Sequence, residues 1–172
     1  VTAIGGGAVT LASAQTDNFN GPSLNTSLWA SGLWAGGVYN PSFAGGQITL
    51  PGGGYIRSQN TFTRGVFEAN ATLGNGAWQH LGFASLDFSG DRYFIFSTAS
   101  GGGNLYARVN NSGSEQTVNL GAIPAGQHAY RIEWTALDVN NDQVTFFVDG
   151  TQVAQMSVNN AGAAFWHTYL TN

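Results

Sequence analysis

The sequence has no cysteine, no lysine and few charged residues of either sign. Without cysteine, the fold needs neither disulfides nor thiolate metal sites, and cysteine usage gives no indication of the redox compartment. Charged residues make up only 8% of the chain and the formal net charge is −4, whereas roughly a quarter of an average soluble domain is charged. Nucleic acids and anionic membranes select for basic surfaces, so neither is expected as a partner. The basic side chains are all arginines: Arg57, Arg64, Arg92, Arg108 and Arg131.

Long apolar runs are also missing. No stretch of about 18 apolar residues occurs, so no membrane span is predicted. The chain begins at Val1 without a methionine or a signal-like stretch, which suggests a processed or trimmed product. Hydrophobic residues make up 42% and aromatic residues 13% of the 172 residues, enough for the core of one globular domain. A surface of Asn, Gln, Ser, Thr and Gly in place of charges favours a secreted or cell-surface protein that contacts neutral polymers.

What the chain does have is an alternation of apolar and polar residues. Along residues 66–73, Phe67 and Ala69 share one side of an extended strand, while Glu68 and Asn70 share the other. Side chains on a strand alternate with a period of two, so this pattern predicts one face in a core and one polar face outward. The same pattern recurs down most of the chain, with almost no helical periodicity.

Glycine-rich breaks separate the expected strands. Asp149-Gly150, between 143–148 and 151–158, is a strong signal for a two-residue hairpin, because both residues tolerate positive φ. Many short strands with no intervening helix predict an all-β fold, an antiparallel sandwich or jelly roll. Strands are expected near residues 47–50, 55–62, 65–73, 79–88, 92–98, 104–110, 116–120, 128–136, 143–149, 151–158 and 164–170.

The first fifteen residues form a separate segment, and residues 16–172 form the domain. Gly5-Gly6-Gly7 interrupts this segment, and Ala8-Val9-Thr10-Leu11-Ala12 has the pattern of one short strand. Two interpretations are open. Residues 1–15 are a linker, or they are an arm that adds a strand to a free sheet edge.

Several segments in a fairly specific order carry a family resemblance. They are Asp17-Asn18-Phe19-Asn20-Gly21, Leu24-Asn25-Thr26-Ser27-Leu28-Trp29, residues 54–58, residues 65–69, residues 130–134 and residues 144–150. Together they resemble concanavalin A-like lectin and glucanase domains, and are most similar to laminarinase-type (family-16) glycoside hydrolases and to laminin-G-like modules. The resemblance covers about residues 16–170. It implies two curved, stacked antiparallel sheets, one of them concave.

The catalytic motif of the resembling enzymes is missing. Those enzymes present two carboxylates from one strand, in a motif of Glu-x-Asp-x-x-Glu form, to the sugar in the cleft. The corresponding stretch, residues 82–96, contains no Glu, and Asp87 and Asp91 flank an expected turn at Ser89-Gly90. No catalytic residue is therefore assigned, and an enzymatic role remains open but is not favoured.

Six residues are the candidates for binding a neutral glycan on the concave face. An aromatic ring can stack on the C–H face of a pyranose while planar polar groups bond its hydroxyls. The alternative is an ordinary solvated sheet face with cross-strand pairs, such as Glu68 with Arg108 or Arg131. The candidates are Glu68, Asn70, Trp78, His80, Tyr106 and Arg108.

No metal or cofactor is predicted. His80, His128 and His167 show no ligand spacing with carboxylates, which argues against zinc. Residues 138–142 carry oxygen side chains at alternate positions but lack the later Gly and Glu of an EF-hand, so a polar hairpin turn is expected there. A structural calcium near Asp17 is known in the resembling folds, but a single Asp is too little to assign one.

The resemblance also implies one further strand after Leu170, pairing near an expected strand at residues 17–20. An open sheet edge promotes association, so we expect either residues 8–12 or a neighbouring subunit to cover it. Three functional hypotheses follow. The chain is an extracellular, non-catalytic carbohydrate-binding or adhesion module, a structural subunit of an extracellular assembly joined by strand addition, or a divergent glycoside hydrolase that uses Glu68 or Glu133.

Overall fold

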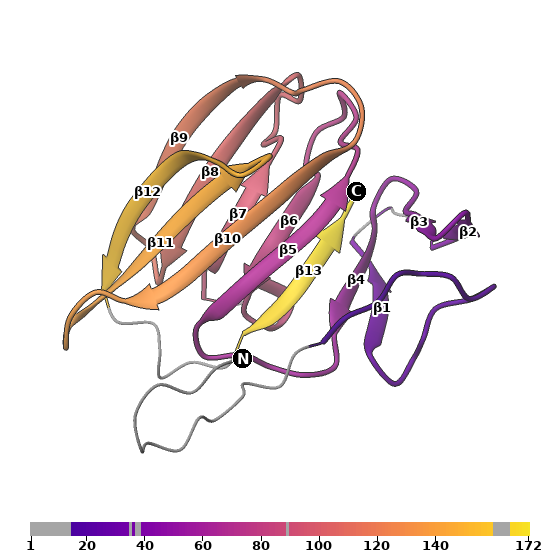
Figure 1. Ribbon diagram of the computed structural model, residues 1–172, viewed down its shortest axis with the longest axis horizontal. Helices are drawn as coiled ribbons and strands as arrows, with labels where there is room; N and C mark the ends of the chain where they lie inside the picture. Colours follow the sequence, from indigo (N-terminus) through magenta and orange to yellow (C-terminus); the bar gives the residue numbers. More distant parts are fainter. Residues whose placement is uncertain (1–14, 35, 37–38, 89, 160–165) are drawn as a thin grey trace.

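The structure, a computed structural model, describes residues 15–34, 36, 39–88, 90–159 and 166–172. It consists of two stacked antiparallel sheets and a short hairpin, so the predicted all-β sandwich is confirmed (Figure 1). The seven-stranded sheet has the order β1-β4-β13-β6-β7-β8-β9, and the four-stranded sheet has the order β12-β11-β10-β5. The strands are β1 Trp29–Leu33, β2 Ser42–Ala44, β3 Gln47–Thr49, β4 Gly54–Ser58, β5 Gly65–Ala71, β6 His80–Ala84, β7 Arg92–Ser97, β8 Asn104–Asn111, β9 Glu115–Ala122, β10 His128–Ala136, β11 Asn141–Val148, β12 Thr151–Asn159 and β13 His167–Thr171.

The expected strands match the observed ones except at four places. The strand expected over residues 55–62 ends at Ser58, and Phe62 forms only an isolated bridge with Trp166. Strands β1 and β2 were not expected, and residues 17–20 form an irregular segment instead of a strand. The strand expected over residues 79–88 ends at Ala84 because the 3-10 turn η1 (Leu86–Phe88) follows. Positive φ at Asp87 and Phe88 takes the chain out of the extended conformation there. The Asp149-Gly150 hairpin is confirmed, with φ of 49° and 77°.

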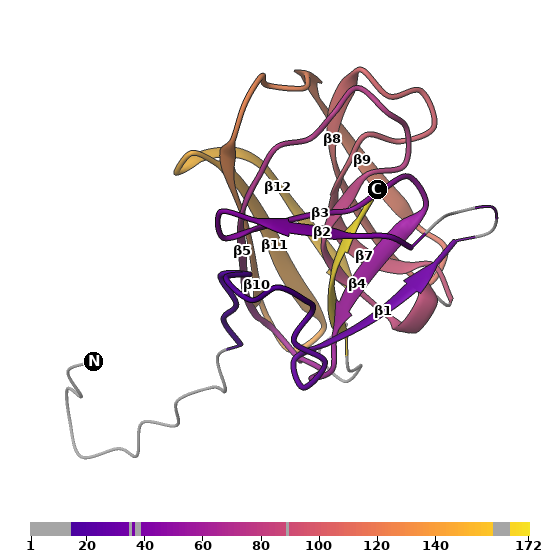
Figure 2. The same cartoon turned by 90° about the vertical axis from the view of Figure 1, so that its right-hand side faces the viewer.

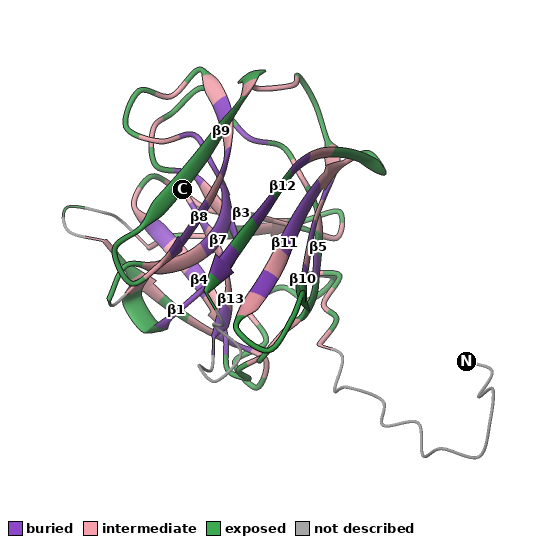
Figure 3. Cartoon of the chain, turned by 90° about the vertical axis from the view of Figure 1, so that its left-hand side faces the viewer, coloured by how far each residue is buried: buried purple, intermediate pink, exposed green. Residues whose placement is uncertain are grey.

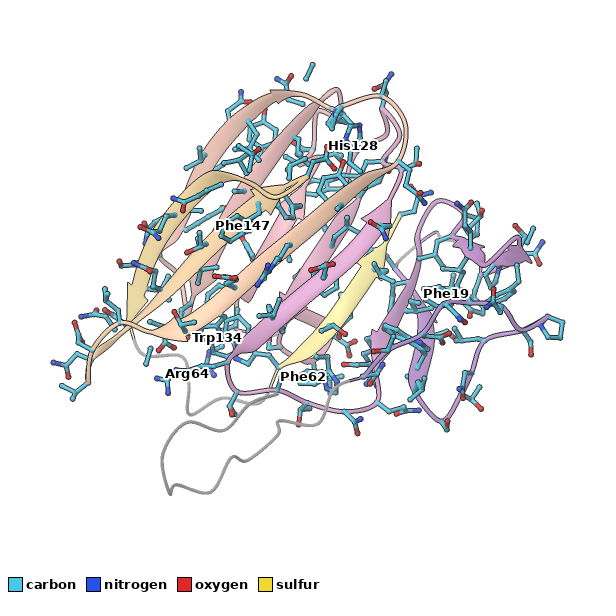
Figure 4. All side chains as sticks on the ribbon, in the orientation of Figure 1. Phe19, Phe62, Arg64, His128, Trp134 and Phe147 are labelled. Carbon is cyan, nitrogen blue, oxygen red and sulfur yellow. The ribbon has the colours of Figure 1, made fainter. Side chains whose placement is uncertain are left out.

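The core lies between the two sheets and is rich in aromatic rings. Phe67 and Leu105 are 6% and 2% exposed, as the period-two pattern predicts, and Figure 3 shows buried residues along strands of both sheets. Near one end of this core, the buried carboxylate of Asp142 accepts hydrogen bonds from Trp134 Nε1 at 2.9 Å and Arg64 Nε at 2.9 Å. Figure 4 shows Arg64 and Trp134 at this end. None of the described segments forms a helix long and apolar enough to cross a bilayer.

Each sheet has one outer face, and the two faces differ in what covers them. We call the outer side of the seven-stranded sheet the seven-strand face, and that of the four-stranded sheet the four-strand face. The side of the sandwich at β9 and β12 is closed by hydrogen bonds from Gln116 to the Ser157 carbonyl and from Asn111 to the Asn159 carbonyl. On the opposite side, the β2–β3 hairpin and residues 15–28 lie beside β1 and β4 (Figure 2).

Candidate functional site

The strand register aligns side chains in rows across the seven-strand face. Antiparallel partners point to the same side of a sheet, so the pairing of His80 with Ser97 and of Ser97 with Tyr106 places these three in one row. A second row joins Gly82, Ile95 and Arg108 in the same way. These rows run across β6, β7 and β8 and form the base of the site.

A pocket of about 600 Å³ opens at one end of this face. Three aromatic rings contribute to its wall, and the remaining lining is glycine, alanine, histidine and asparagine. Among the described residues, the lining contains no Asp, Glu or Arg. The lining residues are Trp34, Gly52, Gly53, Gly76, Ala77, Trp78, His80, Phe88 and Asn172.

Trp78 is held in an exposed and strained position at the pocket. Its side chain is 53% exposed and its φ is 62°, a left-handed conformation that costs a bulky residue of order 1–3 kcal/mol. The backbone N–H donates to the Ala99 carbonyl at 2.8 Å, and the Thr171 hydroxyl donates to the Trp78 carbonyl at 3.2 Å. The surrounding structure therefore fixes a backbone that presents a large ring to solvent.

The loop before Trp78 is fixed by one buried side chain. Gln79, only 6% exposed, accepts a hydrogen bond from the Gly74 N–H at 2.9 Å and donates to the Gly74 and Gly76 carbonyls, each at 3.0 Å. The loop also packs closely on Gly102, where an added Cβ would lie 2.3 Å from the Asn75 carbonyl oxygen. Both contacts pre-organise the rim of the pocket, which lowers the entropy lost when a ligand binds.

Phe88 separates the pocket from the rest of the face. The turn η1 places its ring 5.7 Å from His80, 5.7 Å from Trp34 and 5.1 Å from Tyr169, centroid to centroid. Trp34 in turn lies 4.6 Å from the Tyr55 ring. These edge-on and tilted contacts are the arrangements that aromatic pairs prefer, so Phe88 is a wall of the pocket and not a mobile flap.

His80 is an uncharged polar group in the pocket wall. Burial, together with the nearby positive charge of Arg108, lowers its pKa from 6.5 to about 4. The imidazole is therefore neutral at pH 7, and its buried Nδ1 has no hydrogen-bond partner. Its backbone N–H donates to the Thr171 hydroxyl at 3.1 Å, so the hydroxyl of Thr171 links the backbones of His80 and Trp78.

Arg108 belongs to a polar cluster farther along the same face. Its guanidinium is hydrogen-bonded to Glu115 and lies 5.4 Å from the centre of the Tyr93 ring. The hydrogen bond from Arg108 lowers the pKa of Glu115 below its usual range. The charge of Arg108 is thus balanced locally, and the cluster adds no net charge to the face.

The six predicted residues do not share one face. Trp78 and His80 line the pocket, and Tyr106 and Arg108 lie on the seven-strand face. Glu68 and Asn70 lie on β5, in the other sheet, so the expectation that all six residues line one face is wrong.

The reason is that the chain crosses between the sheets after Ser58 and before Gly65. The polar side of β5 therefore belongs to the four-strand face. Glu68 stands opposite Arg131 there, and Arg131 pairs with Glu133 at 2.5 Å. The exposed polar side of β5 matches the alternative of a solvated sheet face, but the ion pair of Arg131 is with Glu133 on β10 itself and not across the strands with Glu68.

Sequence reasoning did not find several lining residues. Trp34 follows β1, a strand that was not recognised, and Phe88 lies in a turn that was expected to be strand. Asn172 comes directly after the last strand, where its side chain donates to the Leu50 carbonyl at 2.6 Å. The aromatic side chains of Trp34 and Phe88 were the only sequence feature that could have pointed to the pocket. Many core residues of this chain are also aromatic, so this feature does not distinguish the two kinds of residue.

The positions where paired carboxylates were expected hold other side chains. On β6 the outward residues are His80, Gly82 and Ala84, and on β7 they are Tyr93, Ile95 and Ser97. Asp87 is in η1, where the Tyr55 hydroxyl donates to it at 3.4 Å. Hydrolysis with retention requires two carboxyl groups about 5 Å apart, and these two strands supply none.

No metal site is formed by the described residues. They contain no group of three or more His, Asp or Glu side chains placed to hold an ion. The Asp17 carboxylate accepts hydrogen bonds from the Phe19 N–H and from Trp29 Nε1, each at 2.8 Å. Asp138 accepts from the N–H groups of Asn140 and Asn141, which confirms a polar hairpin turn.

Comparison with known proteins gives structural neighbours only. No family model and no curated protein matches the chain. The β-glucanase of Bacillus licheniformis superposes with a TM-score of 0.57 at 20% identity, over 90% of this chain and 83% of that one. Porphyranase B from Zobellia galactanivorans gives 0.58 at 17% identity, over 90% and 77%. The carbohydrate-binding module CBM66 from Bacillus subtilis gives 0.51 at 13% identity, over 86% and 94%.

Identities this low establish similarity of fold and nothing further. The neighbours include enzymes as well as a binding module, so the fold alone does not select one activity. The chain has the concanavalin A-like jelly-roll fold, as its resemblance predicted.

Proposed function

We propose that this domain binds a carbohydrate in the pocket of the seven-strand face and does not cleave it. The observation that carries the proposal is Trp78, a large ring kept half-exposed over an aromatic-lined pocket by a strained backbone. Strain of this kind persists only where the surrounding structure enforces it, and such sites are often functional.

The lining suits an uncharged sugar ring. Trp34, Trp78 and Phe88 offer apolar surfaces for the C–H face of a pyranose, while the Asn172 amide and the neutral His80 imidazole can bond hydroxyl groups. Because none of the lining side chains is charged at neutral pH, nothing in the pocket compensates a carboxylate or a sulfate. We therefore infer a neutral glycan as the ligand.

The side chains of β6 and β7 support binding without hydrolysis. Their outward positions hold no carboxylate, and Glu115 on β9 is already hydrogen-bonded to Arg108. The neighbours named as a glucanase and as a carbohydrate-binding module make a polysaccharide a reasonable ligand class to test first. The small number of charged residues supports a secreted or cell-surface location for such contacts.

A glycan array followed by calorimetry tests the proposal. Trp78→Ala and Trp34→Ala should each weaken binding by about two- to tenfold, since a stacked aromatic ring contributes about 0.5–1.5 kcal/mol. Phe147→Ala is the matched control, because this ring lies under Arg131 on the four-strand face. Binding that survives both tryptophan changes, or reducing sugar released from a bound glycan by the unaltered chain, would contradict the proposal.

A further inference from the structure

Strand β5 has one free edge among the described residues. It pairs with β10 along its whole length, from Gly65 opposite Trp134 to Ala71 opposite His128. No described strand pairs with its other side, which ends the four-stranded sheet. Unpaired N–H and C=O groups of such an edge are a template for another strand.

The neighbouring part of the other sheet is uncovered on the side that should face the core. Strand β13 is central in the seven-stranded sheet, yet its core-facing Thr168 and Leu170 are only partly buried, while the outward His167, Tyr169 and Thr171 are buried. This reverses the order expected for a strand in a sandwich. In Figure 1, no ribbon of the four-stranded sheet lies in front of β13.

The uncovered region is narrow. The core-facing Ile56 on β4, one strand away from Leu170, is 0% exposed. On β5, Phe67 is buried, but Ala69 and Ala71, which also face the core, are only partly buried. Strands in a sheet lie about 4.8 Å apart, and these partly buried residues border a gap beside β5 that one added strand would fill. We call this gap the β5 slot; it is bordered by Ala69, Ala71, Thr168 and Leu170.

We propose that residues 8–12 of the same chain add to the free edge of β5 as an antiparallel strand and fill the β5 slot. These residues lie outside the described part of the chain, and the proposal uses only their sequence and their attachment. In Ala8-Val9-Thr10-Leu11-Ala12, Val9 and Leu11 share one side and would cover Leu170, while Thr10 would face outward beside the polar side of β5.

The attachment point favours the same chain and this direction. Gln15 Nε2 donates to the Leu28 carbonyl at 3.1 Å, and the same carbonyl accepts from the Gln59 N–H at 2.7 Å. The adjacent Ser58 hydroxyl accepts from the Thr168 N–H at 2.9 Å. Gln15 is thereby held at the end of the sandwich where β13 begins.

That end is also where β5 begins, because Phe62 and Trp166 form a bridge just before the two strands. A segment that leads into Gln15 from the slot would run toward this end while β5 runs away from it. This is the antiparallel direction. The three residue steps from Ala12 to Gln15 span up to roughly 10 Å, enough for the segment to enter the slot directly.

Disulfide trapping in the full chain tests the pairing, since the chain has no cysteine of its own. Thr10→Cys combined with Glu68→Cys or with Asn70→Cys should form an intramolecular disulfide under mild oxidation, seen as a monomer of altered mobility and confirmed by peptide mass. Thr10→Cys with Gln152→Cys, on β12 at the opposite edge of the sheet, is the matched control and should not form one.

A second measurement does not depend on the exact register between residues 8–12 and β5, which the disulfides require. Val9→Asp with Leu11→Asp should lower Tm by about 4 °C or more, because each puts a charge against the core, whereas Thr10→Asp should leave Tm unchanged. The proposal is overturned if β5 gives no monomeric disulfide while Tm is unchanged by the paired aspartates. Crosslinked dimers alone would also overturn it, since a second copy would then supply the strand.

Discussion

The two outer faces of the sandwich follow the same alternation rule but carry different kinds of structure. The four-strand face is formed by strand residues alone, such as Glu68, Arg131 and Glu133, which pair or stand opposite one another. The seven-strand face is covered at one end by residues from connections, among them Trp34 and Phe88. Alternation thus gives each sheet a polar outer side, whereas the residues of the connecting loops form the pocket on only one of these sides.

The largest effect is expected from adding one methyl group to β6 at Gly82, where it would point into the core. In Gly82→Ala, the new Cβ would lie 2.3 Å from the Phe94 carbonyl oxygen and 2.7 Å from Ile132 Cδ1, at a φ of 142°. We expect the free energy of unfolding to fall by about 3 kcal/mol or more, measured by urea denaturation. Gly101→Ala, where no atom lies within 4 Å, is the control. Equal stability of the two variants would show that β6 can move enough to relieve the clash with Phe94 and Ile132.

The second effect depends on pH and separates histidines of the two sheets. The pKa of His80 is about 4 in the folded chain against 6.5 ordinarily, so the unfolded chain binds more protons between these values. Stability should therefore decline as pH falls from 6.5 toward 4, by up to about 3 kcal/mol. His80→Gln should reduce this slope in denaturation curves at several pH values.

His128, at the start of β10, is the control with the opposite sign. Its hydrogen bond to Asp149 raises its pKa, so its contribution is complete below pH 6.5 and is lost as pH rises through the raised value. His128→Gln should therefore leave the decline below pH 6.5 in place. If it removed that decline while His80→Gln did not, the assignment of the slope to the pocket would be wrong.

The third effect separates stability from binding at a single position. Trp78→Gly removes the ring and also the strain of a φ of 62°, which glycine adopts freely. Glycan affinity should fall about two- to tenfold, while the free energy of unfolding stays level or rises by up to about 1 kcal/mol. A parallel loss of affinity and stability would instead make Trp78 a packing residue of the rim.

The smallest effect is expected on the four-strand face. Glu68→Gln and Asn70→Ala, at two residues first expected to contact the ligand, should leave affinity and stability unchanged to within about 0.5 kcal/mol. Calorimetry with the glycan found on the array is the measurement. A clear loss of affinity in either variant would place the ligand on the wrong side of the sandwich and would remove the distinction between the faces.

The fold could be predicted because its signals are local. The alternation of Phe67 with Glu68 and the Asp149-Gly150 turn depend only on neighbouring residues, and both are confirmed. Strand β1 was missed because Trp-Ala-Ser-Gly-Leu offers little contrast between its two sides.

Only part of the site could be predicted, because the positions of its residues depend on contacts between distant segments. Trp78 and His80 could be found because they follow a glycine-rich turn. Glu68 was misplaced because a period of two shows that a side chain points outward but not from which sheet. Phe88 could not be placed from sequence because its position depends on positive φ in a turn without a sequence marker at that residue. Carbohydrate binding itself stays a prediction.

The position of Phe88 has a consequence for which part of a polysaccharide the pocket would bind. The Phe88 ring contacts His80, Tyr93 and Tyr169, on three neighbouring strands, so a polymer that crossed the seven-strand face at this point would have to displace it. A sugar seated between Trp34 and Trp78 would thus be a terminal unit. For a given mass of polysaccharide, the amount of bound domain would then increase with the number of chain ends. Short fragments would therefore bind more of the domain than intact polysaccharide chains.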